Sequence, residues 1–254
     1  PNKQKLINMK KLLTLMAFVS IYANAQEFFT VQNGDLYGMV NDKGIEIISP
    51  KYHYLGNFDE IKSGWAKVGY EGLFGFVDKS GKELVEVKYQ FIGNYGVYYA
   101  DWALIKHNGK YGFIDKRGKE VVDPIFEKIN KFGEIHDDWA LVEENSFYGF
   151  IDKTGNKILE TKYEKIDKFD VYKKGWALVL NDAKYGFIDR SGNLIVQPKY
   201  SEISKFDDIK KGWAMITLNG EKYGFIDRDG KEIIPPVYDS VEPFRKQKKI
   251  KYAA

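Results

Sequence analysis

Cysteine is absent from the 254 residues, and histidine occurs only three times. The first absence excludes disulfides, thiolate metal sites, cysteine nucleophiles and a lipidated N-terminal cysteine. The three histidines, His53, His107 and His136, lie at different phases of the repeat described below, so no spacing brings them together. Without Cys or a second local ligand, a zinc site is not expected.

Basic charge is also missing from most of the chain, although 39 basic side chains outnumber 36 acidic ones. Four basic residues precede residue 26 and five follow residue 244, and neither end holds an acid. The body, with 30 basic against 36 acidic groups, is therefore net −6. Because nucleic-acid binding needs a basic surface, we expect no nucleic-acid partner. Aromatic residues make up 16%, which excludes intrinsic disorder.

The only long apolar run lies near the N-terminus, from Leu12 to Ile21. It follows Met-Lys-Lys and precedes an Ala-x-Ala pattern ending at Ala25, which are the parts of a secretory signal peptide. The run is about half of the roughly 20 residues that a transmembrane helix needs. We therefore predict a signal peptide at 9–25, no transmembrane segment, and export to the periplasm, the cell surface or the medium.

The remainder, 26–254, repeats itself every 37 residues. The period is marked by five tryptophans, Trp65, Trp102, Trp139, Trp176 and Trp213, and by a Gly after an aromatic residue, at Gly75, Gly112, Gly149, Gly186 and Gly224. One extra residue stands near Asn219-Gly220. Six units follow, at 28–64, 65–101, 102–138, 139–175, 176–212 and 213–250. Fixed self-similarity at this period is typical of a repeat architecture.

Each unit has the pattern of antiparallel β-structure. In the fifth unit, 176–180 is an apolar run, 185–188 is a second strand, and 194–196 is a third. Asp189 and Gly192 frame a tight turn, which predicts a hairpin between strands two and three. Tyr200, Ile203 and Phe206 indicate a short fourth strand or a bent turn that closes the unit.

The first strand of each unit is apolar on both faces, which predicts burial from both sides. The Gly inside strand two weakens a strand, so we interpret it as space for the Trp ring to lie across the neighbouring backbone. On this interpretation Trp and Gly form the packing joint of the unit. Replacing Trp139 by Ala should then cost about 3–5 kcal/mol.

The run Lys174-Gly175-Trp176-Ala177, followed by Tyr185-Gly186-Phe187-Ile188-Asp189, resembles the WG-repeat (KWG-type) family of bacterial proteins. The resemblance covers 28–244 and implies an all-β repeat domain, often exported, with no catalytic residues to transfer. Departures are Asp101-Trp102 and Asp138-Trp139 in place of Gly-Trp, and Phe28 in place of the first Trp. Phe28 suits a capping unit.

Candidate chemistry is sparse. One carboxylate recurs in each unit, at Asp78, Asp115, Asp152, Asp189 and Asp227, with Asn41 in the first. A ladder of acids binding Ca²⁺ or a sugar is one interpretation, and a turn-initiating Asp is the one we favour. No phosphate loop or nucleophile elbow is present. We predict no enzyme, no catalytic residue, no metal and no cofactor.

Two features break the repeat. Tyr95, Tyr98 and Tyr99 stand where other units have charged linkers, and they are candidate contacts for a glycan or a protein partner. The alternative, which we favour, is local packing between the second and third units. The basic segment from Arg245 to Lys251 is either a solubilising end or a contact for an anionic membrane surface or lipopolysaccharide.

The fold expected is all-β, with six tandem antiparallel units in an open, twisted, solenoid-like array; the alternative is a six-bladed β-propeller. The unit is shorter than common propeller blades, the first unit resembles a cap, and no unit is split between the two ends. The function expected is a non-enzymatic, exported scaffold that binds a protein or another macromolecule at the bacterial envelope. The alternatives are a glycan-binding module and, less favoured, an enzyme. Partner and oligomeric state are left open.

Overall fold

The computed structural model describes residues 28–241, which contain six antiparallel β-sheets. The predicted signal peptide at 9–25 and the basic segment after Arg245 lie outside the described residues. The chain divides into two compact units between Lys88 and Tyr89. The all-β class and the six tandem units are therefore as predicted. No helix of the described part is long and apolar enough to cross a membrane.

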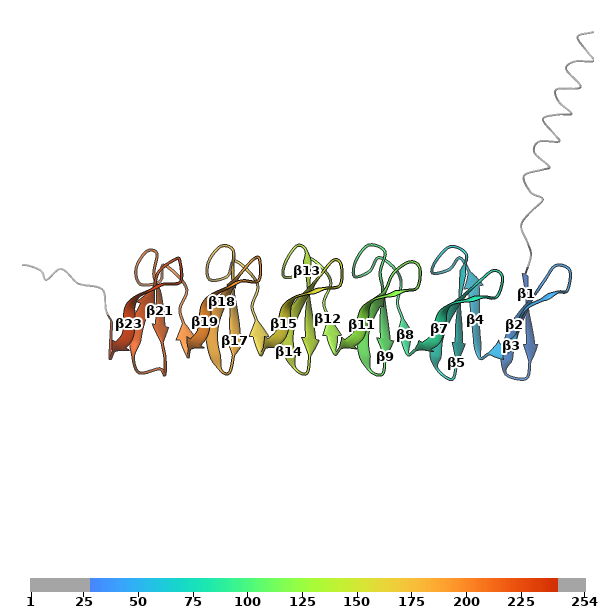
Figure 1. The fold of residues 1–254 in the computed structure, drawn as a ribbon, viewed down its shortest axis with the longest axis horizontal. Coiled ribbons are helices and arrows are strands. Elements are labelled where there is room, and N and C mark those ends of the chain that lie inside the picture. Colours follow the sequence, from blue (N-terminus) through green and yellow to red (C-terminus); the bar gives the residue numbers. More distant parts are fainter. Residues whose placement is uncertain (1–27, 242–254) are drawn as a thin grey trace, which may run out of the picture. The chain divides into compact units, whose positions relative to one another are not determined.

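The strands follow one another as meanders (Figure 1). The first sheet comprises β1 (Phe28–Asn33), β2 (Leu36–Asn41) and β3 (Glu46–Tyr52). The second comprises β4 (Tyr54–Phe58), β5 (Trp65–Tyr70), β6 (Leu73–Asp78) and β7 (Glu83–Tyr89). The third comprises β8 (Phe91–Ile92), β9 (Ala103–His107), β10 (Lys110–Ile114) and β11 (Glu120–Phe126).

The last three sheets repeat this order (Figure 1). The fourth comprises β12 (Lys128–Ile129), β13 (Trp139–Glu144), β14 (Phe147–Asp152) and β15 (Lys157–Tyr163). The fifth comprises β16 (Lys165–Ile166), β17 (Trp176–Asn181), β18 (Lys184–Asp189) and β19 (Leu194–Tyr200). The sixth comprises β20 (Glu202–Ile203), β21 (Ala214–Thr217), β22 (Tyr223–Ile226) and β23 (Glu232–Tyr238).

In the second to sixth sheets, the short first strand comes from the end of the preceding sequence unit. In the fifth sheet, Lys165 and Ile166 of β16 pair with Leu180 and Val179 of β17. The sequence interpretation assigned this element to the unit that it closes. That assignment is wrong, because the short strand forms its hydrogen bonds with the next Trp strand. In the described residues the first sheet has three strands and the other five have four.

The predicted hairpin between the second and third strands is confirmed. In the fifth sheet the turn closes through Gly192 N–H to the Asp189 carbonyl at 3.0 Å, and Gly192 has φ of 80°. The Asp189 carboxylate accepts the N–H groups of Ser191 at 2.8 Å and Asn193 at 2.9 Å. Equivalent bonds form at Asp78, Asp115, Asp152, Asp227 and Asn41. The recurrent Asp is thus a turn residue, as favoured.

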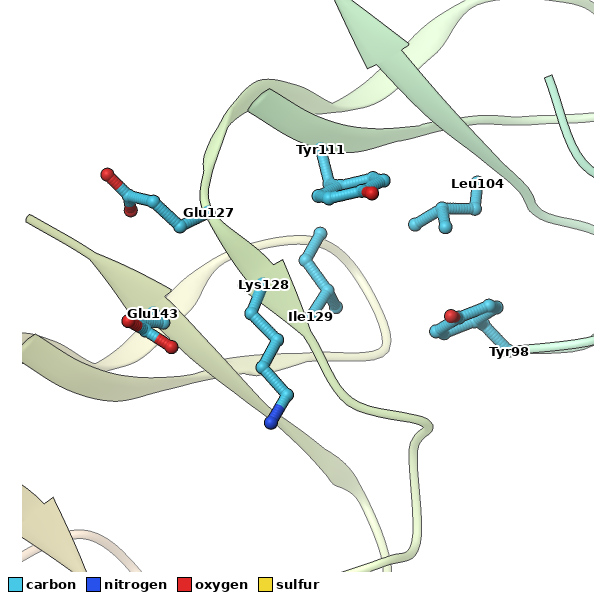
Figure 2. A pocket seen from close by; sticks show the side chains of 7 residues that line it. All are labelled: Tyr98, Leu104, Tyr111, Glu127, Lys128, Ile129 and Glu143. Atoms are coloured by element: carbon cyan, nitrogen blue, oxygen red, sulfur yellow. The ribbon is translucent and has the colours of Figure 1, made fainter. Parts of the chain in front are cut away.

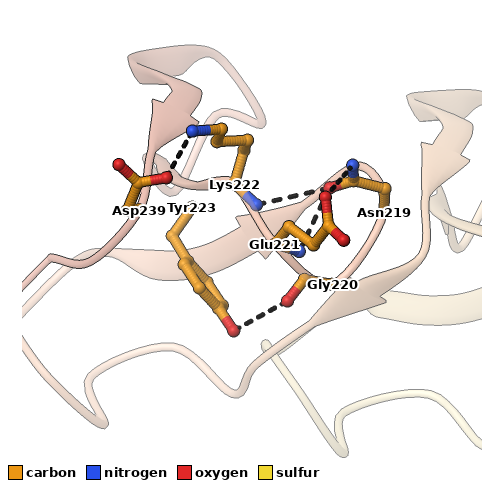
Figure 3. A network of polar contacts seen from close by, with 6 residues as sticks. All are labelled: Asn219, Gly220, Glu221, Lys222, Tyr223 and Asp239. Carbon is orange, nitrogen blue, oxygen red and sulfur yellow. Dashed lines mark hydrogen bonds and ion pairs between the residues drawn. The ribbon is translucent and has the colours of Figure 1, made fainter.

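The extra residue of the sixth unit is absorbed in the loop between β21 and β22 (Figure 3). The Asn219 side chain accepts the N–H groups of Glu221 at 3.1 Å and Lys222 at 3.3 Å. Tyr223 donates its hydroxyl to the Gly220 carbonyl at 2.9 Å, and Lys222 contacts Asp239. A side-chain cap on the loop therefore keeps β22 in register despite the insertion.

The core of each compact unit lies between consecutive sheets. In β17, Trp176 and Leu178 pack toward the sixth sheet, whereas Ala177 and Val179 pack toward the fourth. All four side chains are buried, which confirms the predicted burial of this strand on both faces. Burial is less complete in β1, where Phe29 is 51% exposed. Phe28 of the same strand packs on Phe58, with ring centroids 5.5 Å apart.

Candidate functional site

A cavity of about 440 Å³ opens in the second compact unit, where the third sheet meets the fourth. It is lined by Tyr98, Leu104, Tyr111, Glu127, Lys128, Ile129 and Glu143. We call it the tyrosine pocket. Tyr98 comes from the segment before β9, Leu104 from β9 and Tyr111 from β10, while the other lining residues belong to β12, β13 and the residue before β12.

The pocket has aromatic walls and an apolar floor. Figure 2 shows Leu104 and Ile129 between the rings of Tyr98 and Tyr111. Leu104 and Ile129 are buried, and both tyrosines are partly exposed. Tyr98 is held by Phe113, with ring centroids 5.8 Å apart at 59°. Such a surface presents two aromatic rings together with their hydroxyl groups, which suits a ligand with apolar and polar faces.

The rim of the pocket carries charges of both signs (Figure 2). Glu127 forms an ion pair with Lys110 and accepts the Asn145 N–H at 3.0 Å. The Lys110 contact is the main reason that the pKa of Glu127 lies below its usual range. Glu143 stands opposite Lys128 in the register of β12 and β13, and it accepts a hydrogen bond from Tyr148.

Of the three tyrosines predicted as ligand contacts, one lines the pocket. Tyr98 does, whereas Tyr99 packs on Trp102 at 5.2 Å and on Phe132 at 5.0 Å. Tyr95 donates its hydroxyl to the Asp115 carbonyl at 3.2 Å, and burial raises its pKa. Tyr95 and Tyr99 therefore serve local packing, the alternative that the sequence interpretation favoured, and Tyr98 packs while still facing the pocket.

The histidines lie in separate places, as their phases predicted. His53, between β3 and β4, stacks on Tyr70 with ring centroids 4.7 Å apart. His107 lies in β9, and His136 stacks on Trp139 at 3.9 Å. Burial is the main cause that lowers the pKa of His136. Across residues 28–241 no three His, Asp or Glu side chains gather as a metal site.

The repeat units match one family model along nearly the whole described chain. The model is described as WG containing repeat, and it matches residues 37–73, 74–111, 111–146, 148–185, 185–221 and 223–250. The chain belongs to the WG containing repeat family. No curated protein matches the sequence.

Several solved structures are similar at low identity. Apo AztD from Citrobacter koseri is 12% identical with a TM-score of 0.29, covering 85% of this chain and 72% of AztD. BamB from Moraxella catarrhalis is 11% identical with a TM-score of 0.27, covering 84% of this chain and 70% of BamB. Hsv2 from Kluyveromyces lactis is 8% identical with a TM-score of 0.26, covering 80% of this chain and 71% of Hsv2.

The Gly that recurs in strand two of the WG repeat makes room for the bulged third strand. A Cβ added at Gly75, Gly112, Gly149, Gly186 or Gly224 would lie 2.3–2.4 Å from a third-strand carbonyl oxygen. The three nearest atoms at each are third-strand backbone atoms. The prediction that this Gly accommodates the Trp ring is therefore wrong, although both residues are structural.

Where Asp replaces the Gly before Trp, a second substitution five residues earlier preserves the ion pair with the turn cation. In units with Gly-Trp, Gly175 donates its N–H to the Asp170 carboxylate at 2.5 Å, and Asp170 pairs with Arg190 at 2.5 Å. Where Asp138 precedes Trp139, the position equivalent to Asp170 is Gly133. Asp138 itself then pairs with Lys153 at 2.6 Å. The two departures from the WG motif thus keep one carboxylate beside the turn cation.

Sequence reasoning missed most of the tyrosine pocket. Tyr111 fits the repeat as the aromatic residue before Gly112, and no motif in the sequence singles out Leu104, Glu127 or Glu143. A signal was present in the position of Tyr98 within the period. The five residues at this position are Ile61, Tyr98, Ile135, Tyr172 and Ile209, so tyrosine alternates with isoleucine.

Proposed function

We propose that this WG-repeat protein is a non-enzymatic, exported scaffold that binds a protein or another macromolecule at the bacterial envelope. The observation that carries the proposal is the tyrosine pocket, in which two tyrosine rings flank a buried aliphatic floor. Binding energy in protein interfaces concentrates in such aromatic anchors that fill or line pockets. The remainder of the repeat supplies a rigid frame, because Trp strands such as β17 are buried on both faces.

The test is capture from envelope extract with the purified protein and its Tyr98→Ala/Tyr111→Ala variant. The wild type is expected to retain a defined set of macromolecules that the double variant releases. Tyr70→Ala is the control, because Tyr70 is an exposed tyrosine outside the pocket. If the double variant and the wild type retain the same set, the pocket is not the binding surface.

A second candidate is a glycan-binding module, which is favoured by the combination of the two rings with polar groups at the rim. Tyrosine presents an apolar face and a hydroxyl, and a sugar ring presents the complementary surfaces. A glycan array that contains no binder would argue against this candidate.

Export is the remaining part of the proposal, and it rests on residues 9–25. Expression of the full sequence in a bacterium with a signal peptidase should yield a protein that begins at Gln26. Mass spectrometry of the N-terminal peptide measures this directly. An uncleaved chain retained in the cytoplasm would contradict export.

A further inference from the structure

The alternation of tyrosine with isoleucine places a second tyrosine pair two repeats beyond the first. Tyr172 packs on Phe187 with ring centroids 5.7 Å apart at 61°. The values for Tyr98 and Phe113 are 5.8 Å and 59°. Both pairs belong to the second compact unit. The two tyrosines therefore have the same packing, with one isoleucine-bearing repeat between them.

The floor of the first pocket is also repeated beside Tyr172. Leu178 takes the place of Leu104, Tyr185 that of Tyr111, and Ile203 that of Ile129. Leu178 and Ile203 are each 5% exposed and belong to one buried cluster. Tyr172 and Tyr185 pack against that cluster. The second location thus has two tyrosine rings on a buried aliphatic base, as the first has.

The charges at both locations are mixed. At the first, Glu127 is paired with Lys110, and Glu143 stands opposite Lys128. At the second, Ser201, Glu202 and Thr217 take the places of Glu127, Lys128 and Glu143, so the rim differs in its residues. The ion pair of Lys165 with Asp167, 2.7 Å apart, lies close enough to Tyr172 and Tyr185 to interact with them electrostatically. Rims of mixed sign offer hydrogen-bond donors and acceptors with little net charge. They suit a neutral ligand rich in hydroxyl groups better than a strongly charged one.

We propose that the Tyr98–Tyr111 and Tyr172–Tyr185 pairs, which share the same tyrosine and aliphatic base, are two subsites that together hold one linear, neutral glycan. The inference rests on the binding function proposed above and adds the ligand class and the number of sites. A polymer of identical sugar units suits a protein that repeats the same site at a fixed interval. Two linked contacts on one folded unit raise affinity through effective concentration, without any new kind of contact.

The probes are neutral linear oligosaccharides built from glucose or N-acetylglucosamine, in short and long forms, titrated calorimetrically into the purified full chain. A short oligosaccharide should bind with a stoichiometry of two. A chain long enough to reach both subsites should bind with a stoichiometry of one, and about 10²–10⁴-fold more tightly.

The substitutions introduce isoleucine, because Ile135 occupies this position in the repeat between the two tyrosines. Tyr98→Ile and Tyr172→Ile should each leave one short-oligosaccharide site with unchanged affinity and abolish the gain for the long chain. Ile135→Ala is the matched control and should change neither stoichiometry nor affinity. Ile135→Tyr places a tyrosine beside Tyr148 and should add a third short-oligosaccharide site. Circular dichroism confirms that each variant is folded.

The outcomes separate this inference from the proposed function. Two independent short-ligand sites with no gain for the long chain would overturn the bidentate inference and leave binding intact. Binding at one site only would overturn the assignment of two subsites. A captured protein, or an extended peptide that binds where no neutral glycan does, would overturn the ligand class. Loss of all binding partners, glycan and protein alike, would overturn the proposed function itself.

Discussion

The backbone of the third strand decides which residue can occupy the glycine position of strand two. The third strand bulges, as the register of β18 with β19 shifts between Tyr185 and Ile188. The bulge brings the Val196 carbonyl to 2.3 Å from the point where a side chain at Gly186 would begin. The sequence predicts that this Gly needs space, but it cannot tell which neighbour takes the space. That neighbour is set by a bulge ten residues further along the chain.

Gly75→Ala should therefore destabilise the protein strongly. Its Cβ would lie 2.3 Å from the Val85 carbonyl oxygen, so backbone must move, at a cost of about 3 kcal/mol. Gly69→Ala, in the same sheet, is the control. Its Cβ would lie 3.0 Å from ring atoms of Phe74 and 3.2 Å from the Cβ of Tyr54, a milder overlap than that with a carbonyl at 2.3 Å, so the cost should stay within about 1 kcal/mol. Urea denaturation measures both, and equal losses would contradict the backbone explanation.

The tryptophans differ in burial although their sequence positions are equivalent. Trp139 is 7% exposed and packs on Phe150 with ring centroids 5.3 Å apart. Trp139→Ala should cost about 3–5 kcal/mol of unfolding free energy. Trp213 is partly exposed, so Trp213→Ala should cost less than half as much. Chemical denaturation of the two variants checks the difference, and a larger loss at Trp213 would show that burial does not set the cost.

At the scale of elements, local signals were sufficient for the hairpins and insufficient for the short strands. Asp189 and Gly192 encode their turn within four residues, and the structure contains it. The pairing of Ile166 with Val179 joins residues separated by a loop that carries no strand pattern. Sequence reasoning found the short strand but assigned it to the wrong sheet, because strand partners are set by tertiary packing.

The tyrosine pocket was only partly predictable for a similar reason. Tyr98 broke the repeat and was singled out, whereas Tyr111 obeys the repeat and was not. The pocket exists because two neighbouring sheets bring these tyrosines to Ile129, and that contact follows from the way the sheets stack. The composition of one unit does not contain this information.

A tyrosine–glutamate bond between sheets should make stability depend on pH. Tyr200 donates its hydroxyl to Glu232 at 2.5 Å, and Lys199 pairs with the same carboxylate at 2.7 Å. The hydrogen bond from Lys199, followed by that from Tyr200, lowers the pKa of Glu232 below its ordinary 4.5. A carboxylate with a lowered folded pKa contributes stability above pH about 4.5, and this is lost as the pH falls through the folded value.

Tyr200→Phe should accordingly cost about 1 kcal/mol near neutral pH. Most of that cost should vanish at acid pH, where Glu232 is protonated in both the wild type and the variant. The interface at Phe126, which has no hydroxyl at the same position of the repeat, provides a natural precedent for the substitution. Denaturation curves between pH 3 and pH 7 measure the effect. A cost that is independent of pH would show that the Tyr200–Glu232 bond is not linked to ionisation.

For the whole molecule, the 37-residue period predicts that units can be removed without disturbing their neighbours. In residues 89–241 the strand contacts between different sheets join consecutive sheets, as β14 with β16 and β15 with β17. In an open array the stability is close to a sum of terms for single units and for their interfaces. In a closed propeller every unit also depends on ring closure.

Deletion of 102–138 tests the two alternatives. The junction joins Asp101 to Trp139, so β8 would replace β12 beside β13, with Ile92 opposite Val142 as Ile129 is now. Asp101 would also take the place of Asp138 as the partner of Lys153. The register of the array is thereby kept, and the deletion removes one sheet and one interface. We expect a folded protein with a lower melting temperature.

Deletion from Trp213 onward is the companion variant, and it should leave the preceding sheets folded with a similar loss. Circular dichroism and thermal melts compare both deletions with the full chain. In a closed propeller either deletion breaks the ring and should abolish cooperative unfolding. If both deletions were unfolded or aggregated while the full chain was stable, the open array would be wrong. We expect both to fold, because the strand pairing that the internal deletion severs is rebuilt by residues 37 positions away, as Ile92 takes the place of Ile129 opposite Val142.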